Sequence, residues 1–231
     1  MSNPKLALVG YGKMGNMLDR LAPEFGFEVC ARRDLDRLEP IEGADVAIEF
    51  STPGAVVGNV EFVTGLNIPI IVGTTGWGEH LAEVQNIVRK NAASLVWSPN
   101  FSIGVNVFRR LIEDAAKLLA NEPAYGAWAW EIHHDTKQDA PSGTLIQLVD
   151  AMQSAGYARP IDISSNRAGA HPGTHEIGFD SAADTITLRH TARSREGFAR
   201  GALKAAQWIV RQHRLGKRGF FPFTDVLFGD Q

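Results

Sequence analysis

The chain has 231 residues, of which 44% are hydrophobic and 21% charged, and its formal net charge is −3. This composition is typical of a globular protein, and the slightly acidic balance argues against a nucleic-acid-binding surface. No apolar run approaches membrane-spanning length, and the only cysteine, Cys30, has no partner for an intrachain disulfide, so we expect a cytoplasmic protein. Cys30 lies in an apolar run, which predicts a buried side chain.

Over the first hundred residues, short apolar runs alternate with segments of helical periodicity. The apolar runs predict buried strands at 5–9, 27–31, 46–50, 70–72 and 95–97. The periodic segments predict helices at 12–25, 55–64 and 79–91. This alternation is typical of a Rossmann-type α/β domain, in which a parallel sheet carries helices on both faces.

The pattern changes after Asn100. Helical periodicity covers 104–119 and 143–152, whereas strands are predicted at 128–133, 161–165, 175–179 and 185–190. Consecutive strands joined by a short turn indicate a second, α+β domain with a mixed sheet. We place a dinucleotide-binding domain at residues 1–102, completed by 195–231, and the second domain at 103–194. A last predicted helix, at 201–210, should pack back on the first domain.

A glycine-rich loop follows the first predicted strand and opens the first helix, with the sequence Gly10-Tyr11-Gly12-Lys13-Met14-Gly15. Gly10 permits a tight turn, Gly12 lets the backbone approach a pyrophosphate, and Gly15 lets helix and strand pack closely. The helix N-terminus adds free N–H groups and the positive end of the helix dipole. The loop therefore predicts a nicotinamide dinucleotide site, and a turn that binds nothing is the alternative.

The second predicted strand runs into Arg32, Arg33 and Asp34. An acidic residue at such a strand end usually binds a free ribose 2′-hydroxyl, whereas the planar fork of arginine suits a 2′-phosphate. The two arginines predict that NADPH is preferred, and Asp34 keeps NADH possible. The alternative is that both guanidinium groups are simply solvated at the strand end.

Two further loops follow later strands at the same carboxyl edge of the predicted sheet, where ligands of doubly wound folds bind. Their small, hydroxyl-bearing and amide residues could contact the nicotinamide end of a cofactor. The expected contacts are Gly73, Thr74 and Thr75 in the first loop, and Ser98, Pro99, Asn100 and Phe101 in the second.

The densest group of titratable residues is the stretch Glu131-Ile-His-His-Asp-Thr-Lys-Gln-Asp-Ala-Pro-Ser-Gly-Thr144. Imidazole suits acid–base chemistry near neutral pH, and an ammonium can hold a carboxylate. The turn that ends at Thr144 opens a helix whose N–H groups can bind an anion. The stretch predicts a site for a small anionic substrate. Because His133 and His134 should point to opposite faces of a strand, we expect no metal site here, and no other histidine spacing suggests one.

This stretch closely resembles the pattern E-x-H-H-x-x-K-x-D-A-P-S-G-T of the 4-hydroxy-tetrahydrodipicolinate reductase (dihydrodipicolinate reductase) family. The resemblance extends over nearly the whole chain. Four more motifs of that family occur in order: G-T-T-G at 73–76, N-F-S-x-G-V-N at 100–106, P-G-T-H at 172–175 and S-R-x-x-F-A-x-G-A at 194–202.

The resemblance implies an enzyme that uses NAD(P)H to reduce a cyclic dicarboxylate, 4-hydroxy-tetrahydrodipicolinate, to tetrahydrodipicolinate on the route to diaminopimelate and lysine. It implies that His133 donates the proton and that Lys137 is a second acid group. Substrate carboxylates would contact His134, Gly143 and Thr144, and Arg195 would lie near the cofactor. It also implies a homotetramer assembled through the sheets of the second domain.

The chain departs from the family at its cofactor end. Many members have an extra glycine in the first loop and an acid at the end of the second strand, and many are longer between residues 27 and 44. We therefore expect an altered adenine-side pocket. Two other interpretations stay open: a different two-domain nicotinamide dehydrogenase acting on a related small acid, and a non-catalytic sensor or binding protein on this fold.

Overall fold

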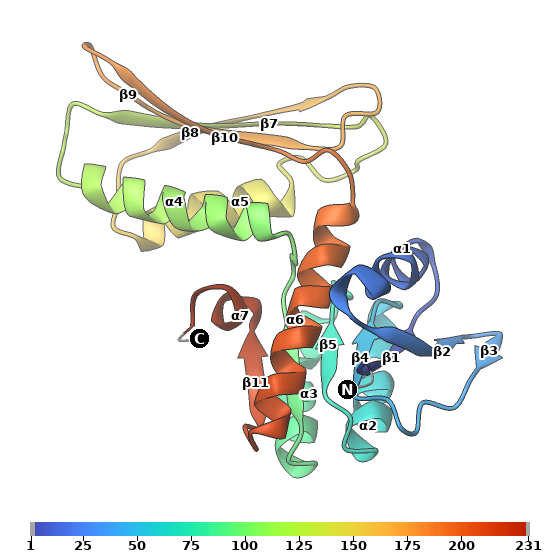
Figure 1. Cartoon of the computed structure of the whole chain (residues 1–231). Helices are drawn as coiled ribbons and strands as arrows, with labels where there is room; N and C mark the ends of the chain where they lie inside the picture. The colour runs from blue at the N-terminus through green and yellow to red at the C-terminus, as the bar shows by residue number, and fades with distance from the viewer. Residues whose placement is uncertain (1–2, 230–231) are drawn as a thin grey trace. The chain divides into compact units, whose positions relative to one another are not determined.

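A computed structural model describes residues 3–229 of the chain (Figure 1). Its internal contacts divide the chain into two compact units. The first contains the residues up to Ile103 together with those from Glu196 onward, and the second is Gly104–Arg195.

The first unit is built on a seven-stranded sheet in the order β11-β6-β5-β4-β1-β2-β3. All neighbouring strands are parallel except β3, which pairs antiparallel with the end of β2. The strands are β1 (Lys5–Val9), β2 (Glu28–Asp34), β3 (Arg37–Leu38), β4 (Val46–Glu49), β5 (Ile70–Val72), β6 (Ser94–Trp97) and β11 (Gly219–Pro222).

Helices cover both faces of this sheet, each over its own hydrophobic cluster (Figure 1). Leu18 and Leu203 belong to the cluster on one face, and Val60 and Val84 to the cluster on the other. The helices are α1 (Lys13–Leu21), α2 (Val56–Gly65), α3 (Leu81–Lys90), α6 (Glu196–Arg214) and α7 (Phe223–Phe228). This parallel sheet with helices on both faces confirms the Rossmann-type architecture, and α6 packs on α1 and on β4, β5 and β6.

The second unit has a four-stranded mixed sheet in the order β10-β9-β7-β8. Strands β7 (Gly126–His133) and β8 (Ile161–Arg167) are parallel, whereas β9 (Thr174–Asp180) is antiparallel to β7 and to β10 (Thr185–Thr191). Helices α4 (Ile103–Leu119) and α5 (Gly143–Ser154) enclose a hydrophobic cluster with one face of the sheet. The predicted mixed-sheet domain is thus present.

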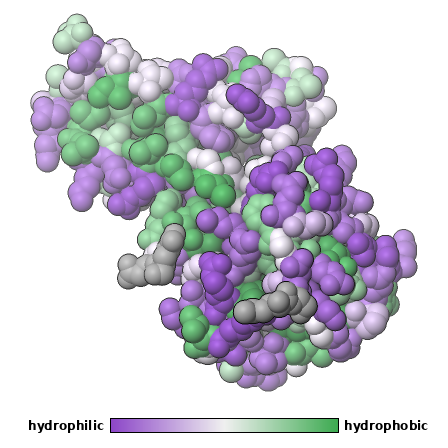
Figure 2. All heavy atoms as spheres, in the orientation of Figure 1, coloured by the Kyte–Doolittle hydropathy of each residue, from purple (hydrophilic) through white to green (hydrophobic). Residues whose placement is uncertain are grey.

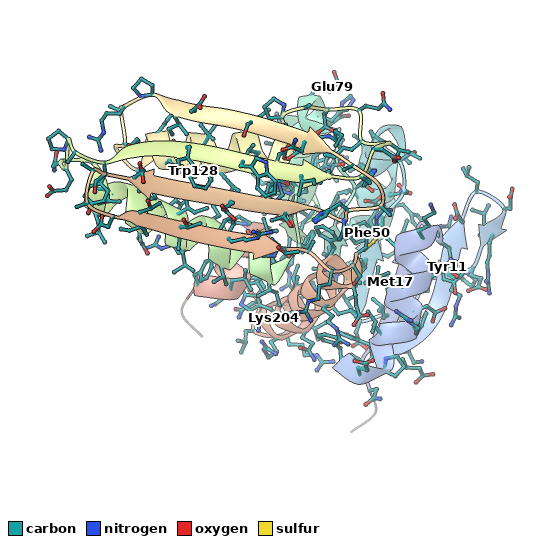
Figure 3. All side chains as sticks on the ribbon, turned by 90° about the horizontal axis from the view of Figure 1, so that it is seen from above. Tyr11, Met17, Phe50, Glu79, Trp128 and Lys204 are labelled. Carbon is teal, nitrogen blue, oxygen red and sulfur yellow. The ribbon has the colours of Figure 1, made fainter. Side chains whose placement is uncertain are left out.

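The opposite face of this sheet carries no helix of the second unit (Figure 1). Alternate residues of β7 point to it, and Figure 3 looks onto it with Trp128 labelled. The Trp128 ring lies across Gly178, where an added Cβ would be 2.1 Å from the indole. On α4, Val107, Leu111 and Leu118 are exposed, and Figure 2 shows apolar side chains gathered along this helix.

Some elements differ from the expectation. The last long helix is α6, which is longer at both ends than the predicted 201–210, and the short β3, β11 and α7 carried no periodic signal. Cys30 is exposed rather than buried, because β3 pairs only with the last two residues of β2 and leaves the rest as a sheet edge. Among residues 3–229, no helix combines the length and apolarity needed to cross a membrane.

Candidate functional site

The glycine-rich loop lies at the carboxyl end of β1 and lines a pocket of about 400 Å³. The pocket is also lined by Arg33 and Asp34 at the end of β2 and by Ser51 after β4. The pocket therefore lies at the carboxyl ends of β1 and β4, between which the strand order changes direction. Ligands of doubly wound sheets usually bind at this position.

The three glycines have different physical roles. Gly10 has φ +89°, and a Cβ there would be 2.0 Å from the carbonyl oxygen of Phe50. A Cβ on Gly15 would be 2.4 Å from the carbonyl oxygen of Gly10, which shows how closely the helix packs. Gly12 has open space within 4 Å, so a ligand can reach its backbone. These are the roles that a pyrophosphate-binding loop needs.

The remaining loop residues divide between the pocket and the helix. Tyr11 lines the pocket, and its hydroxyl donates a hydrogen bond to Asp19 of α1. Lys13 is the exposed first residue of α1, and Met14 packs against the hydrophobic cluster beneath the helix.

The two arginines of β2 are in different environments. Arg32 donates to both carboxylate oxygens of Asp19, at 2.7 and 2.8 Å, so its guanidinium already binds an anion. Arg33 lines the pocket, with its guanidinium 4.5 Å from the centre of the Phe62 ring. Asp34 accepts the backbone N–H groups of Tyr11 and Leu35. The structure thus separates two side chains that the sequence pattern treated as equivalent.

The loop after β5 is tightly packed. A Cβ on Gly73 would be 2.1 Å from the Phe50 ring, so glycine is required there for packing. Thr74 is buried and its hydroxyl accepts the N–H of Ser51, a residue of the pocket wall, whereas Thr75 is exposed. The loop supports the pocket wall through Thr74.

The loop after β6 holds itself by local hydrogen bonds. Ser98 is buried and accepts the N–H of Asn100, while Pro99 is exposed. Phe101 is buried against Phe223, with ring centres 4.8 Å apart, so only its backbone is left for a ligand. Arg195, the last residue of the second unit, is exposed.

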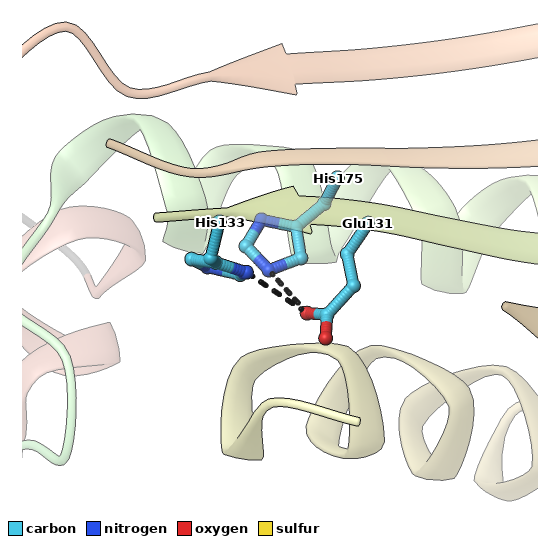
Figure 4. A group of neighbouring side chains, drawn as sticks. All are labelled: Glu131, His133 and His175. Atoms are coloured by element: carbon cyan, nitrogen blue, oxygen red, sulfur yellow. Dashed lines mark ion pairs between the residues drawn. The ribbon is translucent and has the colours of Figure 1, made fainter. Parts of the chain in front are cut away.

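In the second unit, Glu131, His133 and His175 converge beside the N-terminus of α5 (Figure 4). Glu131 and His133 are two residues apart on β7 and share a face, and His175 is the residue paired with Glu131 on β9. One carboxylate oxygen, Glu131 Oε2, lies 3.4 Å from His133 Nδ1 and 3.4 Å from His175 Nε2. All three side chains are buried.

The Glu131 carboxylate is held by groups from several elements. Its Oε1 accepts hydrogen bonds from the backbone of Ser142 at 2.8 Å, the Ser165 hydroxyl at 3.0 Å and Arg167 at 2.9 Å. The Ser142 hydroxyl, which also caps α5, donates to Oε2. Burial by itself would raise the pKa of Glu131, but hydrogen bonds from His175, Ser142 and Arg167 hold it far below its usual value. Glu131 is therefore ionised.

The His133 ring fits between Glu131 and Gly173. Its Nε2 would be 2.9 Å from a Cβ on Gly173, which has φ +131°, so a side chain there would displace the ring. Burial lowers the pKa of His133 to about 4, and the Glu131 carboxylate opposes this shift. His133 is therefore neutral at pH 7 in the free protein, and an anionic ligand would favour its protonation.

The loop after β7 carries the groups predicted to bind carboxylates. Lys137 Nζ is 2.7 Å from Asp139 Oδ1, and the backbone N–H of Gly143 donates to Asp139 Oδ2 at 3.3 Å. The Lys137 hydrogen bond lowers the pKa of the Asp139 carboxyl. An internal carboxylate thus engages both the predicted cation and the first N–H group of α5. His134 Nδ1 is 2.7 Å from Thr136 Oγ1, and Thr144 is half-buried in the first turn of α5.

Glu131, His133 and His175 each offer one ligand atom, and these atoms lie within 4.8 Å of one another, a spacing that a metal ion could use. However, Arg167 already provides a positive charge 2.9 Å from Glu131. A second cation would have to overcome that charge. The donor set therefore favours a proton-binding cluster, and the absence of a metal stays a prediction.

The sequence pattern did not identify His175, Arg167 and Ser142 as partners of Glu131, or Gly173 as a neighbour of His133. The i, i+2 spacing of Glu131 and His133 on a predicted strand could have placed these two on one face. Arg167 and His175 depend on the pairing of β7 with β8 and β9, for which no local signal exists, and Ser142 depends on where α5 begins.

Comparison with known proteins identifies both units. The family model described as "Dihydrodipicolinate reductase, N-terminus" matches residues 22–101, and "Dihydrodipicolinate reductase, C-terminus" matches residues 104–227. A relative named 4-hydroxy-tetrahydrodipicolinate reductase from Christiangramia forsetii is 35% identical over 96% of this chain and 97% of its own. One of the same name from Methanosarcina mazei is 35% identical over 87% of this chain and 80% of its own.

Solved structures agree on the fold. The dipicolinate-bound dihydrodipicolinate reductase of Paenisporosarcina sp. TG-14 has a TM-score of 0.81 at 20% identity, covering 97% of this chain and 99% of the other. A mutant meso-dapdh of Clostridium tetani has a TM-score of 0.60 at 11% identity, covering 98% and 97%.

Proposed function

The chain belongs to the dihydrodipicolinate reductase family, and from that membership we propose that it reduces 4-hydroxy-tetrahydrodipicolinate to tetrahydrodipicolinate with NAD(P)H, a step toward diaminopimelate and lysine. The observation that carries the proposal is the match, over nearly the full length of both chains, to a relative of that name. The intact His133 and Lys137 argue against a non-catalytic protein, which would be free to lose them.

We assign the proton transfer to His133. The 4-hydroxy substrate first loses water, which leaves a conjugated imine. A bound reduced nicotinamide would supply a hydride to one carbon of this imine, and the electron-rich product would then take a proton from His133 on the neighbouring atom. A positioned acid speeds such a step by typically about 10²–10⁴-fold. His133 Nε2 is the ring nitrogen turned away from Glu131, so it is the proton-donating atom in this proposal.

We assign the substrate carboxylates to Lys137, His134 and the first turn of α5, with Gly143 and Thr144. The support is that Lys137 and the Gly143 N–H already bind one carboxylate, that of Asp139. Charge-assisted hydrogen bonds of this kind suit a dicarboxylate. A bound substrate would replace Asp139 at these groups.

The glycine loop and the pocket beside it fit a dinucleotide, because Gly12 is open to a ligand and α1 begins at the next residue. In this proposal the cofactor also contacts the loop after β5, the loop after β6 and Arg195. The loop residues are Gly73, Thr74, Thr75, Ser98, Pro99, Asn100 and Phe101. Arg33, which lines the pocket, supports a preference for NADPH, while NADH stays possible. Arg32 is assigned to Asp19 and not to the cofactor.

We also propose a homotetramer formed through the open face of the second sheet, where Trp128 and Trp130 lie half-exposed. Light scattering would measure the mass, and Trp130→Glu should yield a smaller species because it buries a charge at that interface. An unchanged mass in this variant would contradict the assignment of the face.

The single cysteine is consistent with the cytoplasmic location that we propose.

The direct test supplies the condensation product of pyruvate and aspartate semialdehyde and follows the absorbance of NADPH. Substrate-dependent oxidation is expected, and His133→Gln should reduce kcat by at least about a hundredfold while cofactor affinity is preserved. No oxidation in the wild type would reject the reductase function and favour a dehydrogenase for another small acid. Full turnover by His133→Gln would reject the proton-donor assignment alone.

A further inference from the structure

The Glu131 carboxylate contacts two imidazole rings, those of His133 and His175. Its Oε2 lies at the same distance, 3.4 Å, from His133 Nδ1 and from His175 Nε2 (Figure 4). The two imidazole rings are edge to face, with centres 5.0 Å apart and an angle of 68° between their planes. His133 and His175 thus both lie within ion-pair distance of one anionic oxygen, although His133 Nδ1 makes no hydrogen bond to the described residues. They are also close enough for a charge on either ring to affect the other.

This carboxylate is rigidly placed. Ser142, Ser165 and Arg167 bind its Oε1, so its plane is fixed by α5 and β8 as well as by its own strand. The His133 ring is confined on its other side by Gly173. In an acid–base pair, a carboxylate held at one imidazole nitrogen fixes the ring and stabilises its cation, leaving the other nitrogen to exchange the proton.

We propose that Glu131 and His175 are positioning residues for His133: the Glu131 carboxylate holds the Nδ1 side of the ring and favours its protonated form, while His175 competes for the same oxygen. The proposal rests on the assignment of His133 as the proton donor. It predicts that the two residues act on His133 in opposite directions. Removing the carboxylate makes His133 harder to protonate, and removing the second imidazole makes it easier.

Other charged and titratable groups around this cluster also affect the protonation of His133. Lys137 on the loop after β7 and Arg167 on β8 both oppose a positive charge on His133. On β10, His190 is paired with His175, and its pKa is lowered by burial and by His175. No ion pair joins His190 to Glu131 among the described residues. His190 is therefore a matched control, a nearby half-buried imidazole for which no contact with Glu131 Oε2 is found among the described residues.

The experiment measures the titration of His133 in the free protein by NMR, with histidine labelled at Cε1 and the resonance assigned with His133→Gln. Glu131→Gln keeps the size and hydrogen-bonding oxygen of the side chain but removes its charge. It should lower the His133 pKa by one unit or more, and so reduce the protonated fraction at least tenfold above both pKa values. His175→Asn should raise the His133 pKa, and His190→Asn should leave it unchanged.

The alkaline limb of kcat/KM should move in the same directions in the same variants. Shifts of the same sign in Glu131→Gln and His175→Asn, or no shift in either, would overturn the proposal. If Glu131→Gln does not fold, His175→Asn decides alone, since only an upward shift supports the competition. Because the NMR titration needs no substrate, absent turnover with the expected shifts would refute the proposed function and not this inference.

Discussion

Replacing Arg33 by alanine should weaken NADPH binding while leaving NADH binding nearly unchanged. Arg33 lines the pocket at the end of β2. Among the described residues, its guanidinium contacts the Phe62 ring and donates one hydrogen bond, 3.1 Å long, to the carbonyl of Glu39. It can therefore turn to a phosphate at little cost. Hydrogen bonds to charged groups contribute about 1.5–3 kcal/mol, which corresponds to a loss of about tenfold to a hundredfold in NADPH affinity.

Arg32→Ala is the matched control for this prediction. Arg32 and Asp19 form a half-buried ion pair with side-chain exposures of 29% and 19%, held by two hydrogen bonds. Its loss should cost about 1–3 kcal/mol of unfolding free energy, which lowers the melting temperature by several degrees. Asp19 keeps its hydrogen bond from Tyr11, so the pocket wall should survive. The ratio of NADPH to NADH affinity should stay at the wild-type value.

The assay is a fluorescence titration of each variant with NADPH and with NADH, together with thermal unfolding. The reasoning is wrong if Arg32→Ala loses as much NADPH affinity as Arg33→Ala. It is also wrong if Arg33→Ala weakens both cofactors equally, because the effect would then concern the pocket and not the 2′-phosphate.

Three further changes test the second unit. Gly173→Ala places a Cβ 2.9 Å from His133 Nε2 at a residue with φ +131°. The kcat should therefore fall, and the free energy of unfolding should decrease by about 1–3 kcal/mol. Steady-state rates and denaturant melts measure the two effects. Asp139→Asn frees Lys137 of its carboxylate, so the KM for the dicarboxylate should fall, and a higher KM would instead make Asp139 part of the binding geometry. Ser142→Ala removes both the cap of α5 and a hydrogen bond to a buried carboxylate, and should lower the melting temperature by several degrees; an unchanged value would argue against the capping role.

Local patterns were sufficient for most elements of the fold. Strand β1 was predicted with its observed bounds because burial of both faces gives a continuous apolar run. The helix that became α4 was predicted to within one residue because burial of one face imposes a short-range periodicity. The glycine motif predicted the tight turn at Gly10 and the close packing at Gly15. Strand β3 was missed because Arg37 and Leu38 form no apolar run, and β11 was missed because it is held by pairing with the distant β6.

Some features of the candidate site also follow from local sequence, whereas others depend on tertiary contacts. The sequence by itself determined the family, the acid–base stretch at 131–144 and the glycine loop, because each is a contiguous pattern with its own chemistry. Only the tertiary structure decided which arginine faces the pocket, since Asp19 of α1 binds Arg32 whereas Arg33 lines the pocket. It also brought His175 to Glu131 through the antiparallel pairing of β9 with β7. Contacts between segments distant in the chain depend on strand register, and no local period encodes which residues the register will pair.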